Sequence, residues 1–462
     1  MTRRPDPPSE PEYSPDLVQR RMVKGRLPGS RYVRIVQPFS GEFKRQPSGH
    51  LLATERVLER HGPVGRAADL LRETLVGRRI ASEREIHERV GRLKGLAVFA
   101  SDNISSSAYA SEEIMRVLVA AGAGVLVFTM PITIAIVVVL ATVVISYQQT
   151  IRAYPNGGGS YIVASDNLGP FPGLIAAAAL LTDYVLTVAV SIAAGVAALT
   201  SIFPGLFDWR VLIGVAFVGM LWLGNLRGIR ESATLFAIPT YAYLLAIYAL
   251  LAFGLWRVAT GTLPVYHAPP AWLANSSTQT LGIVLVLRAF ASGSVALTGT
   301  EAVSNGVPAF RPPEWVNARA VLVLMGLFFG TIFLGISFLA GQLGVVPDPS
   351  EQQTVLSQIA ATLVGDGSPF HYFLQISTAL LLVLAANTAF ADFPRLASIL
   401  GKDRFLPRQF QFRGDRLAFN VGIMVLAVLA GILIFAFSGS VTNLIPLYTV
   451  GVFVAFTLSQ AG

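Results

Sequence analysis

Long apolar segments dominate this sequence and constrain its fold more than any other feature. A helix that crosses a bilayer needs about 20 apolar residues, and about ten such segments follow Lys94. Hydrophobic residues make up 53% of the 462 positions and charged residues 13%, whereas soluble proteins are about a quarter charged. The sequence therefore predicts an all-α membrane protein, with a transmembrane domain over 95–462. The predicted spans are 96–122, 123–148, 173–202, 210–226, 233–257, 281–306, 318–342, 370–393, 418–438 and 442–460.

Residues 1–94 form a separate polar and basic arm. They hold about 20 of the 35 Lys and Arg residues and about 12 of the 27 Asp and Glu residues, which accounts for nearly all of the formal charge of +8. The opening TRRPDPPSEPEYSPD is rich in Pro and charge, so it predicts disorder. Leucines at helical spacing over 51–77 predict a pair of solvated or membrane-skimming helices. Nucleic-acid binding is the alternative, but no recognisable fold or aromatic interleaving supports such a partner.

The loops between the spans carry an asymmetric positive charge. Cytoplasmic loops of membrane proteins are enriched in Lys and Arg, and about eleven such residues here fall on one side against two on the other. This asymmetry predicts that the N-terminus is cytoplasmic. The first set is Arg152, Arg227, Arg230, Arg311, Arg319, Arg395, Lys402, Arg404, Arg408, Arg413 and Arg416, and the second is Arg210 and Arg257. The apolar finish FVAFTLSQAG predicts that the natural chain continues beyond residue 462.

Two of the predicted spans are interrupted in matching positions. Span one contains ASDNISSSAY, and span six contains ASGSVALTGTEAVSNGVPAF. These are the first helices of two consecutive five-span groups, which enter the membrane from opposite sides because five is odd. Paired interruptions of inverted halves mark the midplane site of a transporter. Close helix packing alone would explain the glycines, but it would not explain why Asp102 and Glu301 fall in the two breaks.

The third predicted span carries a row of oxygen-bearing side chains. Asp183, Thr187 and Ser191 follow one another at four-residue spacing, which places them along one helix face. A lone Thr or Ser in a span usually bonds back to its own helix, but a shared face with a carboxylate weakens that interpretation. Tyr448 is predicted either as an aromatic at the membrane interface or as a pocket wall. The other candidate site residues are Asp102, Tyr109, Tyr184, Thr298 and Glu301.

These residue types favour a cation over most other ligands. Carboxylate, hydroxyl and carbonyl oxygens suit a hard cation, whereas an amino acid carboxylate needs helix N-termini free of negative charge. Glu301 is predicted to carry an exchangeable proton, because neighbouring like charges disfavour joint ionisation. A polyamine would also accept acidic ligands and remains the main alternative.

Several kinds of site are excluded or unsupported. The absence of Cys removes disulfides, thiolate metal sites and cysteine catalysis. The Gly-rich PNGGGSY at 155–161 lacks the preceding strand and following Lys of a phosphate cradle. We therefore predict no enzymatic activity, no cofactor and no metal ion other than a transported monovalent cation.

Taken together, the motifs resemble those of a known family. FASDNISSSAYASEEI, YPNGGGSYIVASDNLG, LLTDYVLTVAVSIAAG, RAFASGSVALTGTEAVSNGVP and NLIPLYTVGVF resemble the amino acid–polyamine–organocation (APC) superfamily, and within it most the KimA-type bacterial potassium importers. The resemblance implies a LeuT-like inverted repeat of 5+5 transmembrane helices, with helices 1 and 6 unwound, in a bacterial inner membrane. It implies potassium import coupled to protons, and homodimers formed through a C-terminal region beyond this sequence. An amino acid or polyamine permease on the same fold is the alternative.

Site roles also follow from the resemblance. It implies that Glu301 couples transport to protons. Asn103 and Ser107 stand where the family would have small apolar residues. The residues that it implies contact the cation or line its pocket are Asp102, Tyr109, Asp183, Tyr184, Thr187, Ser191, Thr298 and Tyr448.

Overall fold

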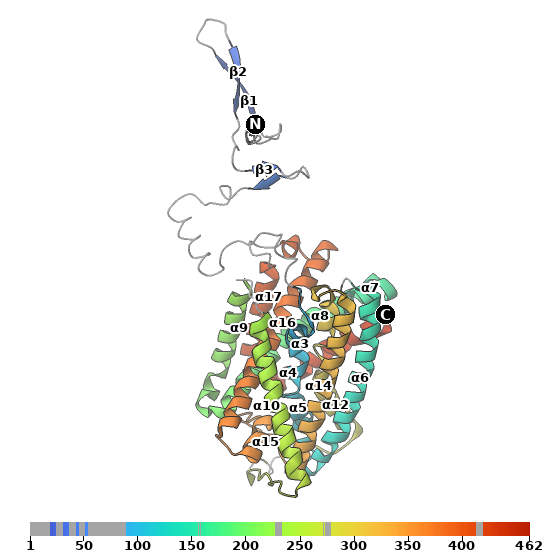
Figure 1. The fold of residues 1–462 in the computed structure, drawn as a ribbon, viewed down its shortest axis with the longest axis vertical. Coiled ribbons are helices and arrows are strands. Elements are labelled where there is room, and N and C mark those ends of the chain that lie inside the picture. Colours follow the sequence, from blue (N-terminus) through green and yellow to red (C-terminus); the bar gives the residue numbers. More distant parts are fainter. Residues whose placement is uncertain are drawn as a thin grey trace, which may run out of the picture. The chain divides into compact units, whose positions relative to one another are not determined.

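The computed structural model separates the chain into two units, Met1–Gly77 and Arg78–Gly462. It describes residues 19–24, 31–36, 43–45, 51–53, 89–155, 157, 159–226, 233–270, 272, 279–412 and 419–462. The predicted boundary of the arm at residue 94 differs from this division, because residue 94 is the seventeenth residue of the second unit. The second unit is a helical bundle (Figure 1).

The described part of the arm forms short strands. β1 (Gln19–Lys24) pairs antiparallel with β2 (Arg31–Val36), and β3 (Phe43–Arg45) pairs antiparallel with β4 (Leu51–Ala53). The helix predicted to begin at residue 51 is therefore wrong over its first three residues. A three-residue stretch is too short to show a helical period, and its pairing with β3 supplies the backbone hydrogen bonds. The rest of the predicted helix pair, 54–77, lies outside the described residues.

Helices account for most of the described residues of the second unit. Eight of them are long and apolar enough to span a membrane. The first predicted span is instead divided into three short helices, and the ninth is a helix of 17 residues. The helices are α3 (Arg92–Phe99), α4 (Ser101–Ser106), α5 (Ala110–Val119), α6 (Thr129–Ala153), α7 (Ser160–Leu168), α8 (Pro170–Ile202), α9 (Arg210–Leu226), α10 (Ala233–Ala259), α12 (Ile283–Gly293), α13 (Thr300–Asn305), α14 (Glu314–Leu343), α15 (Val355–Val364), α16 (Pro369–Lys402), α17 (Asn420–Ala436) and α18 (Val441–Ala461).

Helix α8 forms the centre of the bundle. An apolar stretch of 18 residues within α8 is 89% buried, which is the largest share among the candidate membrane spans of the described residues. Small residues allow its neighbours to approach closely: a Cβ on Gly195 would lie 3.4 Å from the carbonyl oxygen of Ala379 in α16. On the other side, a Cβ on Gly451 of α18 would lie 3.4 Å from the carbonyl oxygen of Ala179. The side chains of α8 are therefore enclosed by protein, where polar groups need partners.

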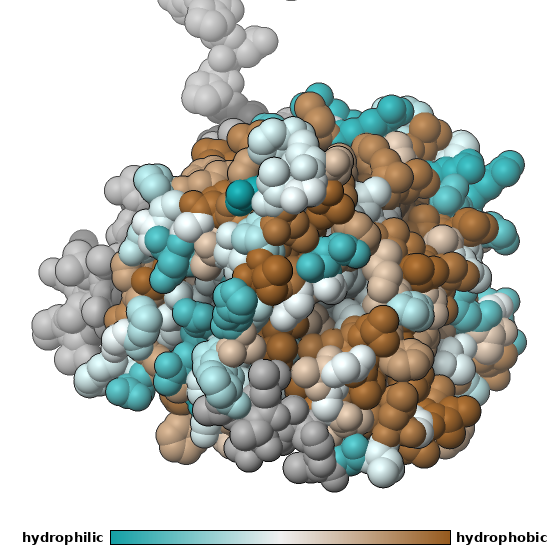
Figure 2. Space-filling model, turned by 90° about the horizontal axis from the view of Figure 1, so that it is seen from below, coloured by the Kyte–Doolittle hydropathy of each residue, from teal (hydrophilic) through white to brown (hydrophobic). Residues whose placement is uncertain are grey.

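The outer surface of the bundle is apolar, as expected for a protein in lipid. On α6, Ile134, Val138 and Ile145 are all exposed, and they would face hydrocarbon in a bilayer. The end of the bundle seen in Figure 2 also carries groups of polar side chains. The chain is a multi-pass membrane protein.

Spans one and six are both interrupted, in different ways. Between α4 and α5, residues 107–109 form hydrogen bonds to the third preceding carbonyl, so the helix tightens into a 3₁₀ turn. Span six continues from α12 into a 3₁₀ turn at Ser294–Leu297, and Thr298 is then extended, with φ −62° and ψ 156°. Gly299 follows with φ 75°, and a Cβ there would lie 2.6 Å from the backbone nitrogen of Asn103. Glycine is therefore required where the two breaks meet.

Candidate functional site

Asn103 joins the two breaks. Its Nδ2 donates hydrogen bonds to the carbonyl oxygens of Ala296 and Thr298, both at 2.9 Å. These carbonyls are free because the α12–α13 segment is not helical there, and in a membrane interior such groups require a partner. These two hydrogen bonds give Asn103 a structural role.

Hydroxyl groups gather directly beside this junction. Ser106 Oγ lies 3.1 Å from the Tyr109 hydroxyl and 3.2 Å from Thr298 Oγ1. The Thr298 hydroxyl also donates to the carbonyl oxygen of Val295, at 2.8 Å. All three residues are buried. The structure thus brings Tyr109 and Thr298 together, as the sequence predicts, and it places Ser106 between them.

The two aspartates each bury an unsatisfied oxygen. Asp102 is 6% exposed, and its Oδ1 has no hydrogen-bond partner among the described residues. Asp183 Oδ1 on α8 is also buried without one. Asn103 Oδ1, next to Asp102, is a third buried acceptor of this kind. Buried carboxylate oxygens are costly unless a donor or a cation compensates them. We name Asp102, Ser106, Tyr109, Asp183 and Thr298 the acidic cluster.

The face of α8 beyond Asp183 meets α18. Thr187 Oγ1 lies 2.8 Å from the hydroxyl of Tyr448, and both residues are buried. A Cβ on Gly451 would lie 3.6 Å from the backbone nitrogen of Asp183, so α18 passes close to the aspartate. Tyr448 is therefore buried inside the protein rather than exposed as an aromatic at the membrane interface. Ser191 is buried on the same helix.

Glu301 belongs to a second polar group. Its Oε2 accepts a hydrogen bond from Ser160 Oγ at 2.8 Å and one from the Tyr147 hydroxyl at 3.5 Å. Asn305 Nδ2 donates to Glu301 Oε1 at 3.4 Å and to the Tyr184 hydroxyl at 3.0 Å. Tyr184 thus lies with Glu301 rather than with the acidic cluster. The carboxylate of Glu301 has donors on both oxygens, unlike Asp102 and Asp183.

A cavity of about 120 Å³ adjoins this second group, at the end of the bundle where α3 begins. We call it the proximal cavity. Tyr184, Asn305, Asp392 and Arg395 line it, and Arg395 Nη1 lies 3.6 Å from Asp392 Oδ1. Asp392 thus lines the proximal cavity together with Tyr184.

Tyr161 in the short helix α7 also lines the proximal cavity. Its hydroxyl donates to Asp403 Oδ2 at 2.7 Å. Burial and the bond to this carboxylate raise the pKa of Tyr161 to about 12. The phenol therefore stays a neutral donor at physiological pH and ties α7 to the segment after α16.

Sequence reasoning missed Tyr147 and Ser160. The Gly-rich segment before α7 held a signal for Ser160, because it allows a close approach. A Cβ on Gly157 would lie 2.9 Å from the carbonyl oxygen of Asn305. That approach brings the start of α7 to Glu301. Tyr147 has no comparable local signal in α6.

The acidic cluster offers two carboxylates and three hydroxyl groups. Among the described residues, no three His, Cys, Asp or Glu side chains come together as ligands. Carboxylate and hydroxyl oxygens with free lone pairs are ligands that suit hard cations.

Comparisons with known proteins identify the family of the chain. A family model described as amino acid permease matches residues 91–462. The chain belongs to the amino acid permease family. The potassium transporter KimA of Bacillus subtilis (strain 168) is 44% identical over 394 residues, which cover 85% of this chain and 64% of the relative. This permease thus spans less than two thirds of the length of that relative.

Among solved structures, this permease is similar to a Na⁺-coupled sialic acid symporter in a substrate-bound, outward-open state. The TM-score is 0.39 at 10% identity, over 84% of each chain. The family and the curated relative are transport proteins rather than enzymes, so the predicted superfamily and protein class are confirmed.

Replacing Asn103 should test the junction of the two breaks. Asn103→Leu keeps the size of the side chain but leaves two buried carbonyls without a donor, at a cost of about 2–4 kcal/mol. We expect a clear fall in the thermal stability of the purified protein. Asn167→Leu is the control, since exposed Asn167 also donates two hydrogen bonds but leaves groups that water can reach. Equal stability of the two variants would contradict the role given to Asn103.

Proposed function

We propose that this permease imports a monovalent cation, most simply potassium, and couples import to protons. The observation that carries this proposal is the pair of buried carboxylate oxygens, Asp102 Oδ1 and Asp183 Oδ1, that have no hydrogen-bond partner in the described structure. A dehydrated cation between them would compensate both charges. The name of the curated relative, a potassium transporter, supports the choice of ion.

The same oxygens argue against an amino acid as the substrate. An amino acid carries its own carboxylate, which would be repelled by Asp102 and Asp183 in a low-dielectric site. The family name alone, amino acid permease, therefore does not decide the substrate. A polyamine is the second candidate, because its separated amines could use the acidic cluster and Glu301 together.

We assign proton coupling to Glu301. Donors from Ser160, Tyr147 and Asn305 surround its carboxyl group, so it does not need the cation for compensation. It also borders the proximal cavity through Asn305, which would give protons a route. Loss or gain of a proton here would change the hydrogen bonds that position α13 and α7, and this would link the proton to the two-break junction.

We further propose the architecture that the paired breaks indicate. The elements α3–α10 would form one five-span repeat and α12–α18 its inverted counterpart, as in LeuT-like transporters. The N-terminus and the basic loops would face the cytoplasm. Residues 1–94 would form a cytoplasmic arm in a protein of a bacterial inner membrane.

Neutralising the aspartates should abolish transport. We expect Asp102→Asn and Asp183→Asn each to lower potassium uptake into proteoliposomes by at least about 100-fold. The loss of one charged ligand from a dehydrated ion costs on the order of 3 kcal/mol. Asp208→Asn is the matched control, because Asp208 is exposed in the turn before α9. Near-normal uptake by both variants would show that Asp102 and Asp183 do not form the cation site.

Replacing Glu301 should separate coupling from binding. Glu301→Gln is permanently neutral, so we expect it to bind potassium but to lose uptake driven by a pH gradient. Retained pH-driven flux in the Glu301→Gln variant would contradict the coupling role of Glu301 but not the proposed cation binding. If the substrate is a polyamine, spermidine should instead outcompete potassium in the wild type, and Glu301→Gln should weaken spermidine binding itself. Binding of both ligands to purified protein, with flux in liposomes, distinguishes these results.

Cysteine labelling should fix the orientation, since the natural chain has no Cys background. Lys402 is the last residue of α16, Thr262 lies just after α10, and both are exposed. The predicted topology places them on opposite sides of the membrane. We expect Thr262→Cys, and not Lys402→Cys, to react with an impermeant reagent added outside intact cells. The reverse pattern would show that the predicted orientation is wrong.

A further inference from the structure

A second, smaller cavity lies at the other end of the broken first span. We call it the distal cavity. Its volume is about 30 Å³, and residues of α5, α8, α16, α18 and the segment before α15 line it. Tyr109 is one of them, and its hydroxyl lies 3.1 Å from Ser106 in the acidic cluster. The two sites are therefore adjacent, with Tyr109 between them.

One ion pair in the wall of the distal cavity is already complete. Glu112 Oε1 lies 2.5 Å from Arg116 Nη2, and Glu112 Oε2 accepts a hydrogen bond from the backbone nitrogen of Val355 at 2.9 Å. Arg116 Nη1 donates to the carbonyl oxygen of Asp348 at 2.9 Å. The charge of Arg116 is thus matched by Glu112.

Two further carboxylates line the distal cavity beyond this pair. Glu113 is 2% exposed and accepts a hydrogen bond from Thr442 Oγ1 at 3.1 Å, while Arg116 Nε is 3.9 Å away. Glu351 accepts a hydrogen bond from Ser440 Oγ at 2.8 Å. Among the described residues, Arg116 is the one positively charged residue in this lining, and it is already paired with Glu112, so the three carboxylates leave the cavity wall with an excess of negative charge that disfavours anions.

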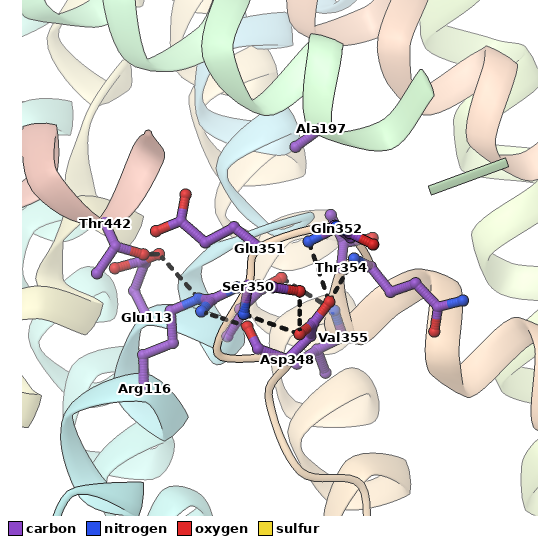
Figure 3. Close-up of polar contacts among 12 residues, drawn as sticks. Glu113, Arg116, Ala197, Asp348, Ser350, Glu351, Gln352, Thr354, Val355 and Thr442 are labelled. Carbon is purple, nitrogen blue, oxygen red and sulfur yellow. Dashed lines mark hydrogen bonds and ion pairs between the residues drawn. The ribbon is translucent and has the colours of Figure 1, made fainter. Parts of the chain in front are cut away.

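The loop that presents Glu351 is held in a defined shape. Asp348 accepts hydrogen bonds from the backbone nitrogens of Ser350, Gln352 and Gln353 at 2.9, 3.0 and 3.1 Å. Glu351 itself adopts φ 58°, a conformation uncommon outside glycine. In Figure 3 its carboxylate extends toward Glu113 and Thr442. The loop therefore accepts backbone strain while it directs this carboxylate.

Gln375 gives an independent sign of a missing ligand. It is 0% exposed, and neither its Oε1 nor its Nε2 has a partner among the described residues. It lies on α16 and lines the distal cavity. A buried amide without partners costs stability, so it indicates that something else occupies the space beside it.

We propose that the distal cavity is a second cation site, which holds one alkali cation between Glu113, Glu351 and the Gln375 amide oxygen. This proposal rests on the cation transport proposed above. It adds a second cation-binding site next to the acidic cluster on the same transport pathway. The space is about that of one water molecule, which fits a single ion that has lost most of its hydration.

Rubidium binding to the purified protein tests this proposal, with rubidium-86 as the potassium probe. We expect two binding components in the wild type and only the distal one in Asp102→Asn. In that background, Glu351→Gln or Gln375→Leu should weaken the remaining binding about tenfold, as the loss of one ligand predicts. Glu351→Asp keeps the charge and should restore part of the affinity. Asp208→Asn is again the control.

Four outcomes would overturn the proposal. Asp102→Asn could bind no rubidium at all, or its binding could be unchanged by both distal substitutions. Calcium could displace rubidium at equal concentration, which would make the site divalent. Gln375→Leu could raise thermal stability and leave binding intact, which would mean that the cavity holds only water. By contrast, equal rubidium binding by the wild type and Asp102→Asn, abolished by Glu351→Gln, would contradict the acidic cluster and leave the distal site standing.

Discussion

The hydrogen bonds from Asn103 to the second helix break position the members of the acidic cluster that lie on the two interrupted helices. Two interrupted helices leave backbone carbonyls that neither lipid nor the helices themselves can satisfy. The amide side chain of Asn103 donates hydrogen bonds to two of these carbonyls, those of Ala296 and Thr298. The same contact places Asp102 beside Gly299, and it brings Ser106 within hydrogen-bonding distance of Thr298. A shift of either break would therefore separate the carboxylate from the hydroxyls.

The buried acidic side chains fall into two groups that differ in the hydrogen-bond partners of their carboxylate oxygens. Asp102 and Asp183 each keep a bare oxygen, while Glu301 has hydrogen-bond donors on both. An ion that enters the acidic cluster gains the compensation that the first pair lacks, and a proton on Glu301 would change a separate set of bonds. α13 joins the two, because its first turn carries Glu301 and follows directly after Thr298 and Gly299. The proposed coupling between cation and proton needs only that this short helix move with its hydrogen bonds.

The sequence predicts those parts of the fold that local patterns control. Hydropathy locates the spans, and helical spacing aligns Asp183 with Thr187, whose hydroxyl meets Tyr448. Adjacent residues are harder to assign, because Tyr184 is turned about 100° from Asp183 on the helix, and it contacts Asn305 instead. Partners from distant elements, such as Ser160 for Glu301, depend on how α7 folds back. The paired strands of the arm were missed because three to six residues carry little periodicity. The first and ninth spans, predicted from hydropathy, do not form long continuous helices, since a broken or 17-residue helix is still apolar.

Anomalous diffraction from crystals grown with thallium, an electron-rich substitute for potassium, tests the central claim most directly. The account predicts a peak in contact with Asp102 Oδ1 and Asp183 Oδ1, within reach of the hydroxyls of Ser106, Tyr109 or Thr298. The peak should disappear in Asp102→Asn crystals grown under the same conditions. A thallium peak elsewhere, with these two oxygens bound only to water or to each other, would contradict it.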